Sequence, residues 1–321
     1  MTHDHHDFDA PSDEDSSFAS AALAGLAGSP KTLPCQFFYD ARGSELFELI
    51  TDVPEYYPTR TEASILSACA GEIAAETPTG SVLVEFGSGS SRKTEILLTA
   101  LDALKAYVPI DVSGSALDEA RERLSTRFPN LIVHPIVGDF RAALVLPDDL
   151  ASRPRLGFFP GSTIGNFAPR EAADLLRSMA ASLALGGRLI IGVDLRKDRA
   201  RLLPAYNDAA GVTAAFNLNL LVRANRELGA DFDLAGFEHE AIFNAEKSRI
   251  EMHLISTRKQ TVSLLGRHFD FRPGESIHTE NSHKYSVSDF GDLARSAGWT
   301  PRRVWTDAQS LFSVHELVVA G

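Results

Sequence analysis

The chain has 321 residues, of which 44% are hydrophobic and 23% are charged, and its mean hydropathy is −0.07. These values are typical of a globular protein with one large or two modest domains. The formal net charge of −12 argues against general binding to nucleic acids or anionic membranes, because neutralising phosphates requires clustered Lys and Arg. The two cysteines, Cys35 and Cys69, form no C-x-x-C pair, so we expect no disulfide framework and a cytoplasmic location.

Residues 1–18 are polar and charged with almost nothing to bury, and we expect them to form a disordered tail. Three histidines near its start, His3, His5 and His6, have the chemistry to catch metal ions, but a solvated tail is the simpler interpretation. The acidic start does not match a signal peptide. No apolar run approaches the roughly 18 residues of a membrane span.

Apolar runs and helical stretches alternate through the first half of the chain. Short runs rich in β-branched and aromatic residues predict strands at 82–86, 106–112, 131–137, 156–161 and 188–195. Apolar spacing near i, i+3, i+4 predicts helices between them at 94–105, 115–128 and 170–184. Such alternation implies crossover connections and a parallel sheet that is buried on both faces.

This rhythm breaks after residue 197. A helical stretch, 198–234, is followed by strand-like segments over 238–271, a further helix at 287–299 and two closing strands at 302–307 and 312–320. We predict an α/β domain with a doubly wound, mostly parallel sheet, interrupted by a smaller α+β insertion. The main domain would comprise 62–196 and 287–321, and the smaller domain would comprise 19–61 and 197–286.

A glycine-rich loop, GSGSSRKT, begins at Gly87 directly after the first predicted strand. It nearly matches the P-loop G-x-x-x-x-G-K-[ST] and the dinucleotide fingerprint G-x-G-x-x-G. Arg92 occupies a required glycine position in both, and a side chain there would obstruct the close helix–strand packing of the dinucleotide fold. Glu85, just before the loop, suits a cationic ligand better than a polyphosphate.

Polar residues follow the other predicted strands, at the sheet edge where ligands bind in such folds. Asp111 is placed to accept from ribose hydroxyls, Asp139 and Phe140 to bracket an adenine ring, and Asn166 lies after the fourth strand. A pyrophosphate needs a bare helix N-terminus, so Arg92 favours S-adenosylmethionine over NAD. Each of the two aspartates has a simpler interpretation as a cap or turn residue.

Two stretches outside the predicted sheet are candidates for an acceptor site. Residues 37–62 are dense in tyrosines, and residues 276–286 are dense in short polar side chains with one acid. The alternatives are a buried aromatic cluster with satisfied hydroxyls for the first stretch and a surface loop for the second.

Nine segments taken together resemble the histidine Nα-methyltransferase family of ergothioneine biosynthesis. They lie in the expected order between about residue 32 and residue 286: FFYDARGSELFELIT, PEYYPTRTE, EFGSGSSRKT, PIDVS, GDF, FPGSTIGNF, AYNDAAGVTAAFN, NRELGADFDL and TENSHKY. The resemblance implies a seven-strand, Rossmann-like methyltransferase fold with a substrate-binding insertion. It also implies trimethylation of the α-amine of L-histidine to hercynine, with S-adenosylmethionine as donor. We expect a monomer that needs no metal.

The resemblance also assigns roles to individual residues. The methyl donor would contact Tyr39, Gly87, Lys93, Asp111, Asp139 and Phe140. The substrate would contact Tyr56, Asn166, Tyr206, Met252, Glu280, Asn281 and Ser282. Within these sets Lys93 would meet the donor's methionyl carboxylate, Asn166 and Tyr206 the carboxylate of the amino acid, and Glu280 and Ser282 its imidazole. Tyr39 would also act in catalysis by orienting the amine.

One residue departs from the resemblance. His283 directly follows Ser282, where a small or apolar residue is expected, and we expect a surface histidine. Three alternatives stay open at this point: a methyltransferase of the same fold acting on another amino acid or a histidine derivative, a nucleotide-dependent oxidoreductase, and a catalytically silent binding protein. Glu280 and Ser282 argue against the first, and Arg92 argues against the second.

Overall fold

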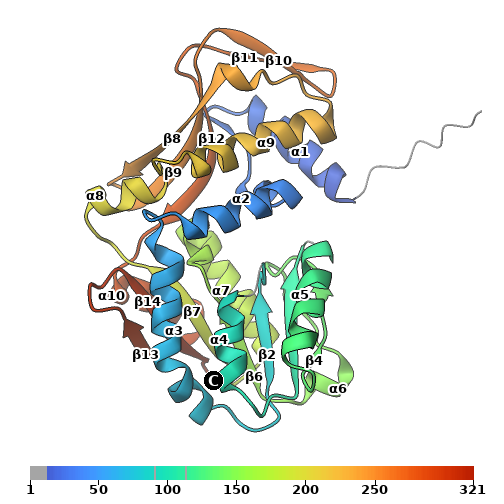
Figure 1. Ribbon diagram of the computed structural model, residues 1–321, viewed down its shortest axis with the longest axis vertical. Coiled ribbons are helices and arrows are strands. Elements are labelled where there is room, and N and C mark those ends of the chain that lie inside the picture. The colour runs from blue at the N-terminus through green and yellow to red at the C-terminus, as the bar shows by residue number, and fades with distance from the viewer. Residues whose placement is uncertain (1–12, 90–91, 113) are drawn as a thin grey trace, which may run out of the picture. The chain divides into compact units, whose positions relative to one another are not determined.

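The computed structural model describes residues 13–89, 92–112 and 114–321 (Figure 1). The chain divides into two compact units. Unit 1 comprises residues up to Ile50 together with Tyr206–Ile242 and Glu251–Glu280, and unit 2 comprises Thr51–Ala205, Phe243–Ile250 and Asn281–Gly321. Among the described residues, no helix has the length and apolar character needed to cross a membrane.

Unit 2 is built around a mixed sheet, which in the described part of the chain has eight strands. The order is β13-β14-β7-β6-β2-β3-β4, and β5 also pairs with β3. The bounds are β2 (Val82–Phe86), β3 (Ala106–Asp111), β4 (Ile132–Val133), β5 (Ile136–Val137), β6 (Arg155–Phe159), β7 (Arg188–Asp194), β13 (Trp299–Thr306) and β14 (Phe312–Val319). The pairs from β7 to β4 are parallel, and β14 runs antiparallel to β7 and β13.

The strand predicted at 131–137 forms as two short pieces on the same edge of the sheet. Ala106 is opposite Ile132 of β4, and Ile110 is opposite Ile136 of β5. Pro135 lies between them and has no N–H to give to the ladder, so pairing is interrupted there. Since β4 and β5 share one edge, the sheet has seven positions, which confirms the seven-strand methyltransferase architecture.

Helices cover both faces of this sheet, as predicted. One core contains residues of α3 (Tyr57–Ala75), α4 (Arg92–Ala100) and α5 (Gly114–Arg127) with Leu83 of β2. The other contains residues of α6 (Asp148–Ala151), α7 (Pro169–Leu183) and α10 (Val287–Ser296) with Val82 and Val84 of the same strand. Successive strand residues point to opposite faces, which explains why neighbouring residues of β2 pack into different cores; Figure 1 shows helices on both sides of this strand.

Unit 1 has a sheet in the order β1-β12-β9-β8 and a separate hairpin of β10 and β11. The strand bounds are β1 (Lys31–Thr32), β8 (Phe237–Asn244), β9 (Arg249–Ser256), β10 (Gln260–Leu264), β11 (Arg267–Phe271) and β12 (Ser276–His283). The helices of unit 1 are α1 (Asp13–Ala27), α9 (Val212–Leu228) and most of α2 (Ala41–Asp52), with 3-10 turns at Cys35–Phe38 and Leu234–Gly236. Unit 2 also contains α8 (Arg199–Leu202) and 3-10 turns at Thr163–Asn166 and Leu203–Ala205.

Helix α9 is closed at both ends by local chemistry. The carboxylate of Asp208 accepts hydrogen bonds from the N–H groups of Val212 and Thr213, each at 2.8 Å, which satisfies donors that the first turn leaves without partners. At the other end Gly229 has φ of 61°, a left-handed conformation that glycine adopts without steric cost. The two caps fix where this helix starts and stops.

Three boundary predictions need correction. The tail predicted to reach residue 18 overlaps α1, in which Phe18 is fully buried; residues 1–12, with their three histidines, lie outside the described residues. The domain boundary falls after Ile50 instead of residue 61, because α3 packs into the core of unit 2. Within the predicted smaller domain, the segments 197–205, 243–250 and 281–286 also belong to unit 2, where the N–H of Lys284 donates to the carbonyl of Ser248.

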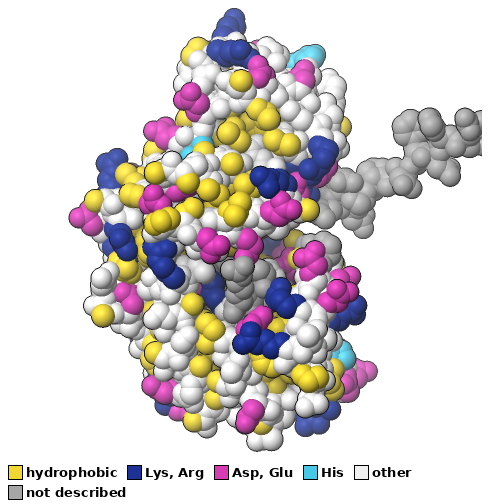
Figure 2. Space-filling view, in the orientation of Figure 1, with side chains coloured by type: hydrophobic (Ala, Val, Ile, Leu, Met, Phe, Trp, Pro, Cys, Tyr) yellow, Lys and Arg dark blue, Asp and Glu magenta, His cyan; other side chains and the backbone are white. Residues whose placement is uncertain are grey.

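Charged side chains of both signs are interspersed on the face of the molecule seen in Figure 2. Among the ion pairs of the described helices, Arg121 pairs with Asp118 and Arg295 with Asp292 at (i, i+3) spacing. Both partners of each pair are exposed, and such pairs contribute about 0.3–0.5 kcal/mol each. They have little influence on which fold forms.

Candidate active site

The glycine loop after β2 brings three of the predicted donor-binding residues together. Gly87 and Gly89 both have positive φ, 73° and 44°, and the N–H of Gly89 lies 3.2 Å from Oδ2 of Asp111 at the end of β3. A Cβ built on Gly87 would lie 3.2 Å from Cε1 of Phe140. A side chain at Gly87 would therefore press on this ring, and the loop backbone and the aromatic face form one compact surface.

Glu85 has a different role from the one predicted. Its side chain is buried, where it accepts hydrogen bonds from Thr94 of α4, at 2.7 and 2.8 Å, and from the hydroxyl of Tyr107. Burial raises the pKa of Glu85 to about 8 although both hydroxyls oppose the shift. The carboxyl is mainly protonated at neutral pH and ties β2 to β3 and α4, so it offers no negative charge to a cationic ligand.

Lys93, in the first turn of α4, forms an ion pair that the sequence did not predict. Its ammonium lies 2.6 Å from Oε2 of Glu62, which is buried. The same carboxylate accepts from the N–H of Gly161 at 2.9–3.0 Å. Glu62 therefore joins α3, α4 and the loop after β6, and compensates the charge of Lys93. The predicted contact of Lys93 with the donor stays a prediction.

Asp139 and Asn166 differ in what holds them. The carboxylate of Asp139 accepts from the backbone N–H of Arg141 at 2.9 Å and pairs with its guanidinium at 2.6 Å, which matches the simpler interpretation of a turn residue. Burial would raise its pKa, but the two interactions with Arg141 hold the pKa below its usual value. Asn166 ends a 3-10 turn with a half-buried side chain.

Residues 276–283, for which a surface loop was the alternative, form strand β12. Because side chains alternate along a strand, Glu280 and Ser282 lie on one face and Asn281 on the other. His283, expected at the surface, is buried. Its backbone passes so close to Gly165 that a Cβ on this glycine would lie 2.8 Å from the carbonyl oxygen of His283.

A buried polar cluster lies next to Ser282 in unit 2. The ammonium of Lys284 donates to Oγ of Ser282 at 2.7 Å and lies 2.6 Å from Oδ2 of Asp194. Asp194 also accepts from Lys197 at 2.5 Å and from the hydroxyl of Tyr57 at 2.8 Å. Burial alone would raise the pKa of Asp194, but the two ammonium groups lower it. Burial lowers the pKa of Lys197 to about 8.

Sequence reasoning missed this cluster and the Glu62 pair. Tyr57 and Asp194 are separated by more than a hundred positions, and no spacing rule joins them. The one available signal was local: Asp194 follows the apolar run 189–193 at the end of its strand, and a carboxylate buried at such a place needs cationic partners.

Three further predicted site residues lie in unit 1. Tyr39 is 39% exposed, and its ring packs edge-on against Phe47 and Phe216 at centroid distances of 5.6 and 5.8 Å. Tyr206 is buried, and its carbonyl oxygen lies 2.8 Å from Nε2 of His239. Met252 of β9 is buried. Glu280 also belongs to unit 1, and the other predicted site residues belong to unit 2, with Tyr56 just before α3.

The comparisons with known proteins agree with this architecture. A solved S-adenosylmethionine-dependent methyltransferase from Clostridium acetobutylicum has a similar fold, with a TM-score of 0.51 over 86% of this chain and 99% of that chain at 12% identity. At this level of identity the comparison shows a shared fold and no more. The family model described as "Histidine-specific methyltransferase, SAM-dependent" matches residues 18–319, and the chain belongs to this family.

Individual relatives are similar over nearly the whole chain. Histidine N-alpha-methyltransferase of Mycolicibacterium smegmatis is 43% identical over 296 residues, covering 91% of each chain. The protein of the same name from Mycobacterium tuberculosis is 42% identical over 297 residues, again with 91% of each chain. Ergothioneine biosynthesis protein 1 of Neurospora crassa is 34% identical over 86% of this chain, which matches 32% of that longer protein.

Proposed function

We propose that this enzyme trimethylates the α-amine of L-histidine to hercynine, the first step of ergothioneine biosynthesis, with S-adenosylmethionine as the methyl donor. The names of the relatives from Mycolicibacterium smegmatis and Neurospora crassa support both the substrate and the pathway. The structural observation that carries the proposal is the arrangement of β12, which places a carboxylate and a hydroxyl, Glu280 and Ser282, on one face.

The contact between Lys284 and Ser282 determines whether the Ser282 hydroxyl donates or accepts a hydrogen bond toward the substrate. An ammonium only donates hydrogen bonds, so Oγ of Ser282 accepts from Lys284 and the hydroxyl is a donor toward a further partner. A neutral imidazole has one N–H and one unprotonated nitrogen. It would donate to Glu280 and accept from Ser282, whereas an indole or phenyl ring would satisfy only part of this pattern.

The remaining substrate residues suit the amino-acid end. The neutral side chains of Asn166 and Tyr206 can donate to the carboxylate without bringing a competing charge, and Tyr56 would complete this part of the pocket. The hydroxyl of Tyr39 would orient the lone pair of the amine toward the methyl group, directly or through water. In-line displacement depends mainly on such alignment.

The donor supplies a methyl group attached to a sulfonium, which leaves as a neutral thioether. No negative charge develops on that leaving group, so we propose that the transfer requires no metal. The open loop backbone at Gly87 and Gly89, with Phe140 beside it, fits a nucleoside that carries no phosphate. Asp111 and Asp139 would accept from its polar groups, and Lys93 would meet its carboxylate.

Stepwise methylation followed by mass spectrometry tests the proposal. The purified chain is incubated with S-adenosylmethionine and each of the standard amino acids in separate reactions. Histidine should gain up to three methyl groups, and the others should gain few or none. A different preferred amino acid, or no product from histidine, would overturn the assignment.

A relative with another substrate motivates a second candidate function. The 4-dimethylallyltryptophan N-methyltransferase of Aspergillus fumigatus is 31% identical over 91% of each chain, which makes a tryptophan-type acceptor the main competitor. The reactions above should include this acceptor, and the direction of the Ser282 hydroxyl favours histidine.

A further inference from the structure

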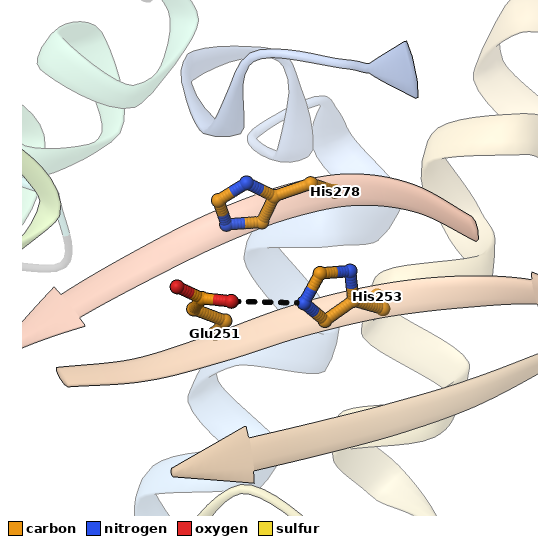
Figure 3. A group of neighbouring side chains, drawn as sticks. All are labelled: Glu251, His253 and His278. Atoms are coloured by element: carbon orange, nitrogen blue, oxygen red, sulfur yellow. Dashed lines mark hydrogen bonds and ion pairs between the residues drawn. The ribbon is translucent and has the colours of Figure 1, made fainter. Parts of the chain in front are cut away.

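Three side chains that the methyl-transfer chemistry does not use converge on one face of the sheet in unit 1. Glu251 and His253 lie two residues apart on β9, and His278 lies on the neighbouring strand β12. Figure 3 shows the three side chains directed toward one another. Each offers one potential metal-ligand atom, and these atoms all lie within 4.8 Å of one another.

The distance between His253 and Glu251 fits metal coordination as well as a hydrogen bond. Nε2 of His253 lies 3.3 Å from Oε2 of Glu251, slightly beyond the usual range of about 2.7–3.2 Å for an N–H···O hydrogen bond. Two ligand atoms at about 2.0–2.1 Å from a tetrahedral zinc ion are about 3.3–3.4 Å apart. The distance between Nε2 of His253 and Oε2 of Glu251 therefore already matches that between two ligand atoms of a zinc ion.

The two imidazoles are held face to face. Their ring centroids are 4.8 Å apart with an interplanar angle of 21°, and Nε2 of His278 lies 3.0 Å from the carbonyl oxygen of Glu280. The ligand atoms of the three side chains lie up to 4.8 Å apart, which is longer than the edge of a tetrahedral zinc site. One imidazole must therefore turn before all three side chains can bind the same ion.

Two of the three side chains in this group are largely buried, unlike the exposed acidic groups that often cluster on protein surfaces. The side chains of Glu251 and His253 are only 10% and 14% exposed, and Nδ1 of His253 is a buried nitrogen without a hydrogen-bond partner in the described residues. Cationic partners stabilise a buried carboxylate, and a divalent cation beside Glu251 would be one.

We propose that Glu251, His253 and His278 bind one divalent transition-metal ion of the Zn²⁺ type. Two imidazoles with one carboxylate are a common ligand set for such ions, whereas Mg²⁺ and Ca²⁺ prefer oxygen ligands alone. Three protein ligands leave a fourth position for water. None of the three residues is among those proposed above to contact the donor or the histidine, so failure of one assignment leaves the other standing.

Zinc titration of the full-length chain tests this proposal. His3, His5 and His6 should first be replaced together by Ala, because the tail could bind metal by itself. In that background isothermal titration calorimetry should report one zinc ion per chain. His253→Ala and His278→Ala should each weaken the affinity at least about tenfold, since losing a ligand costs no less than the 10–100-fold seen for outer-shell partners.

His268→Ala is the matched control, because His268 is an exposed histidine of β11 outside the group. It should leave the zinc affinity unchanged. Circular dichroism of each variant should match the parent, and Glu251→Gln provides a variant of equal size should an alanine variant not fold. The absence of zinc binding in the tail-substituted chain, or equal zinc binding by the parent and both histidine variants, would overturn the proposal.

Discussion

The ammonium of Lys284 lies 2.6 Å from the carboxylate of Asp194, and the exposed fractions of the two side chains are 0% and 1%. Lys197 and the hydroxyl of Tyr57 also contact this carboxylate, so one buried anion serves two ammonium groups. Lys284 also donates to Ser282, whose hydroxyl is proposed to bind the imidazole. The same lysine therefore contributes both to the stability of unit 2 and to substrate recognition.

Replacing Lys284 by Met should therefore affect both stability and recognition. Removing one partner of a buried ion pair costs about 3–5 kcal/mol, and the remaining Lys197 should keep the loss of unfolding free energy near about 3 kcal/mol. The KM for histidine should rise more than kcat falls, because Ser282 loses the group that orients it. Urea denaturation and steady-state kinetics measure the two effects.

Lys247→Met is the control, since Lys247 is exposed in the turn between β8 and β9. It should change neither quantity. If Lys284→Met behaved like this control, the cluster would have no part in stability or recognition.

Substitutions at two glycines with similar backbone angles distinguish the effect of backbone strain from the effect of steric contact. Gly87 and Gly186 have φ of 73° and 76°, but only a Cβ at Gly87 would meet the ring of Phe140; at Gly186 there is open space. Each change to Ala should cost about 1 kcal/mol of stability from the left-handed backbone. Only Gly87→Ala should raise the Kd for S-adenosylmethionine several-fold, as calorimetry can measure; equal affinities would remove Gly87 from the donor site.

The protonated Glu85 predicts an unusual pH dependence. The folded pKa of about 8 exceeds the ordinary value of 4.5, so between these values the folded state holds a proton that the unfolded state has lost. The stability contributed by Glu85 is then fully present below about pH 4.5 and is lost as the pH rises through about 8, by at most about 1.4 kcal/mol per pH unit.

Glu85→Gln mimics the protonated carboxyl and should remove this dependence. Relative to the parent, the variant should gain stability between pH 5 and pH 8, as measured by urea denaturation at both pH values. Glu246→Gln is the control, because Glu246 is exposed in a turn. Its stability relative to the parent should not change with pH between these values. A stability difference between Glu85→Gln and the parent that does not change with pH would show that Glu85 is ionised in the folded state.

Tyr39→Phe tests the proposed alignment of the amine. The ring should keep its edge contacts with Phe47 and Phe216, so only the hydroxyl is lost. The rate of methyl transfer in single-turnover experiments should fall more than the affinity for histidine. Equal losses in both would mean that the hydroxyl contributes to binding alone.

Glu280→Ala tests recognition of the imidazole. Histidine should lose far more kcat/KM than tryptophan does, because only histidine is proposed to donate to this carboxylate, and a hydrogen bond to a charged group contributes about 1.5–3 kcal/mol. Glu280→Gln keeps an acceptor oxygen and should be intermediate. An unchanged preference between the two amino acids in Glu280→Ala would exclude Glu280 from recognition.

The regular part of the fold was predictable from sequence because its signals are local. The strand at 82–86 and the helix at 115–128 match β2 and α5 to within a residue, since apolar period and length suffice for buried elements. Pro135 was visible in the sequence, yet only the pairing with β3 shows that it divides one strand into two.

The failures of prediction concern residues whose partners are distant in sequence. In Glu85 the sequence presents an acid before a ligand loop, and only the fold shows that this carboxyl is buried, bonded to Thr94 and Tyr107, and raised in pKa by its burial. Strand β12 lacks a clear apolar alternation because it carries polar residues on both faces, so its sequence is that of a loop. His283 was misplaced for the same reason.

The parallel pairing of β1 with β12 means that β1 cannot pair until most of the chain has been synthesised. Lys31 is opposite Ile277, so the first strand has no partner until the ribosome has released most of the polypeptide. Until residue 228 is made, α1 also lacks α9, whose Arg223 lies over the ring of Phe18 in the finished fold. The apolar side chains of α1 are then exposed to other molecules, and such segments favour aggregation. Chaperone capacity, more than the final stability, should therefore limit the yield of this protein in a foreign host.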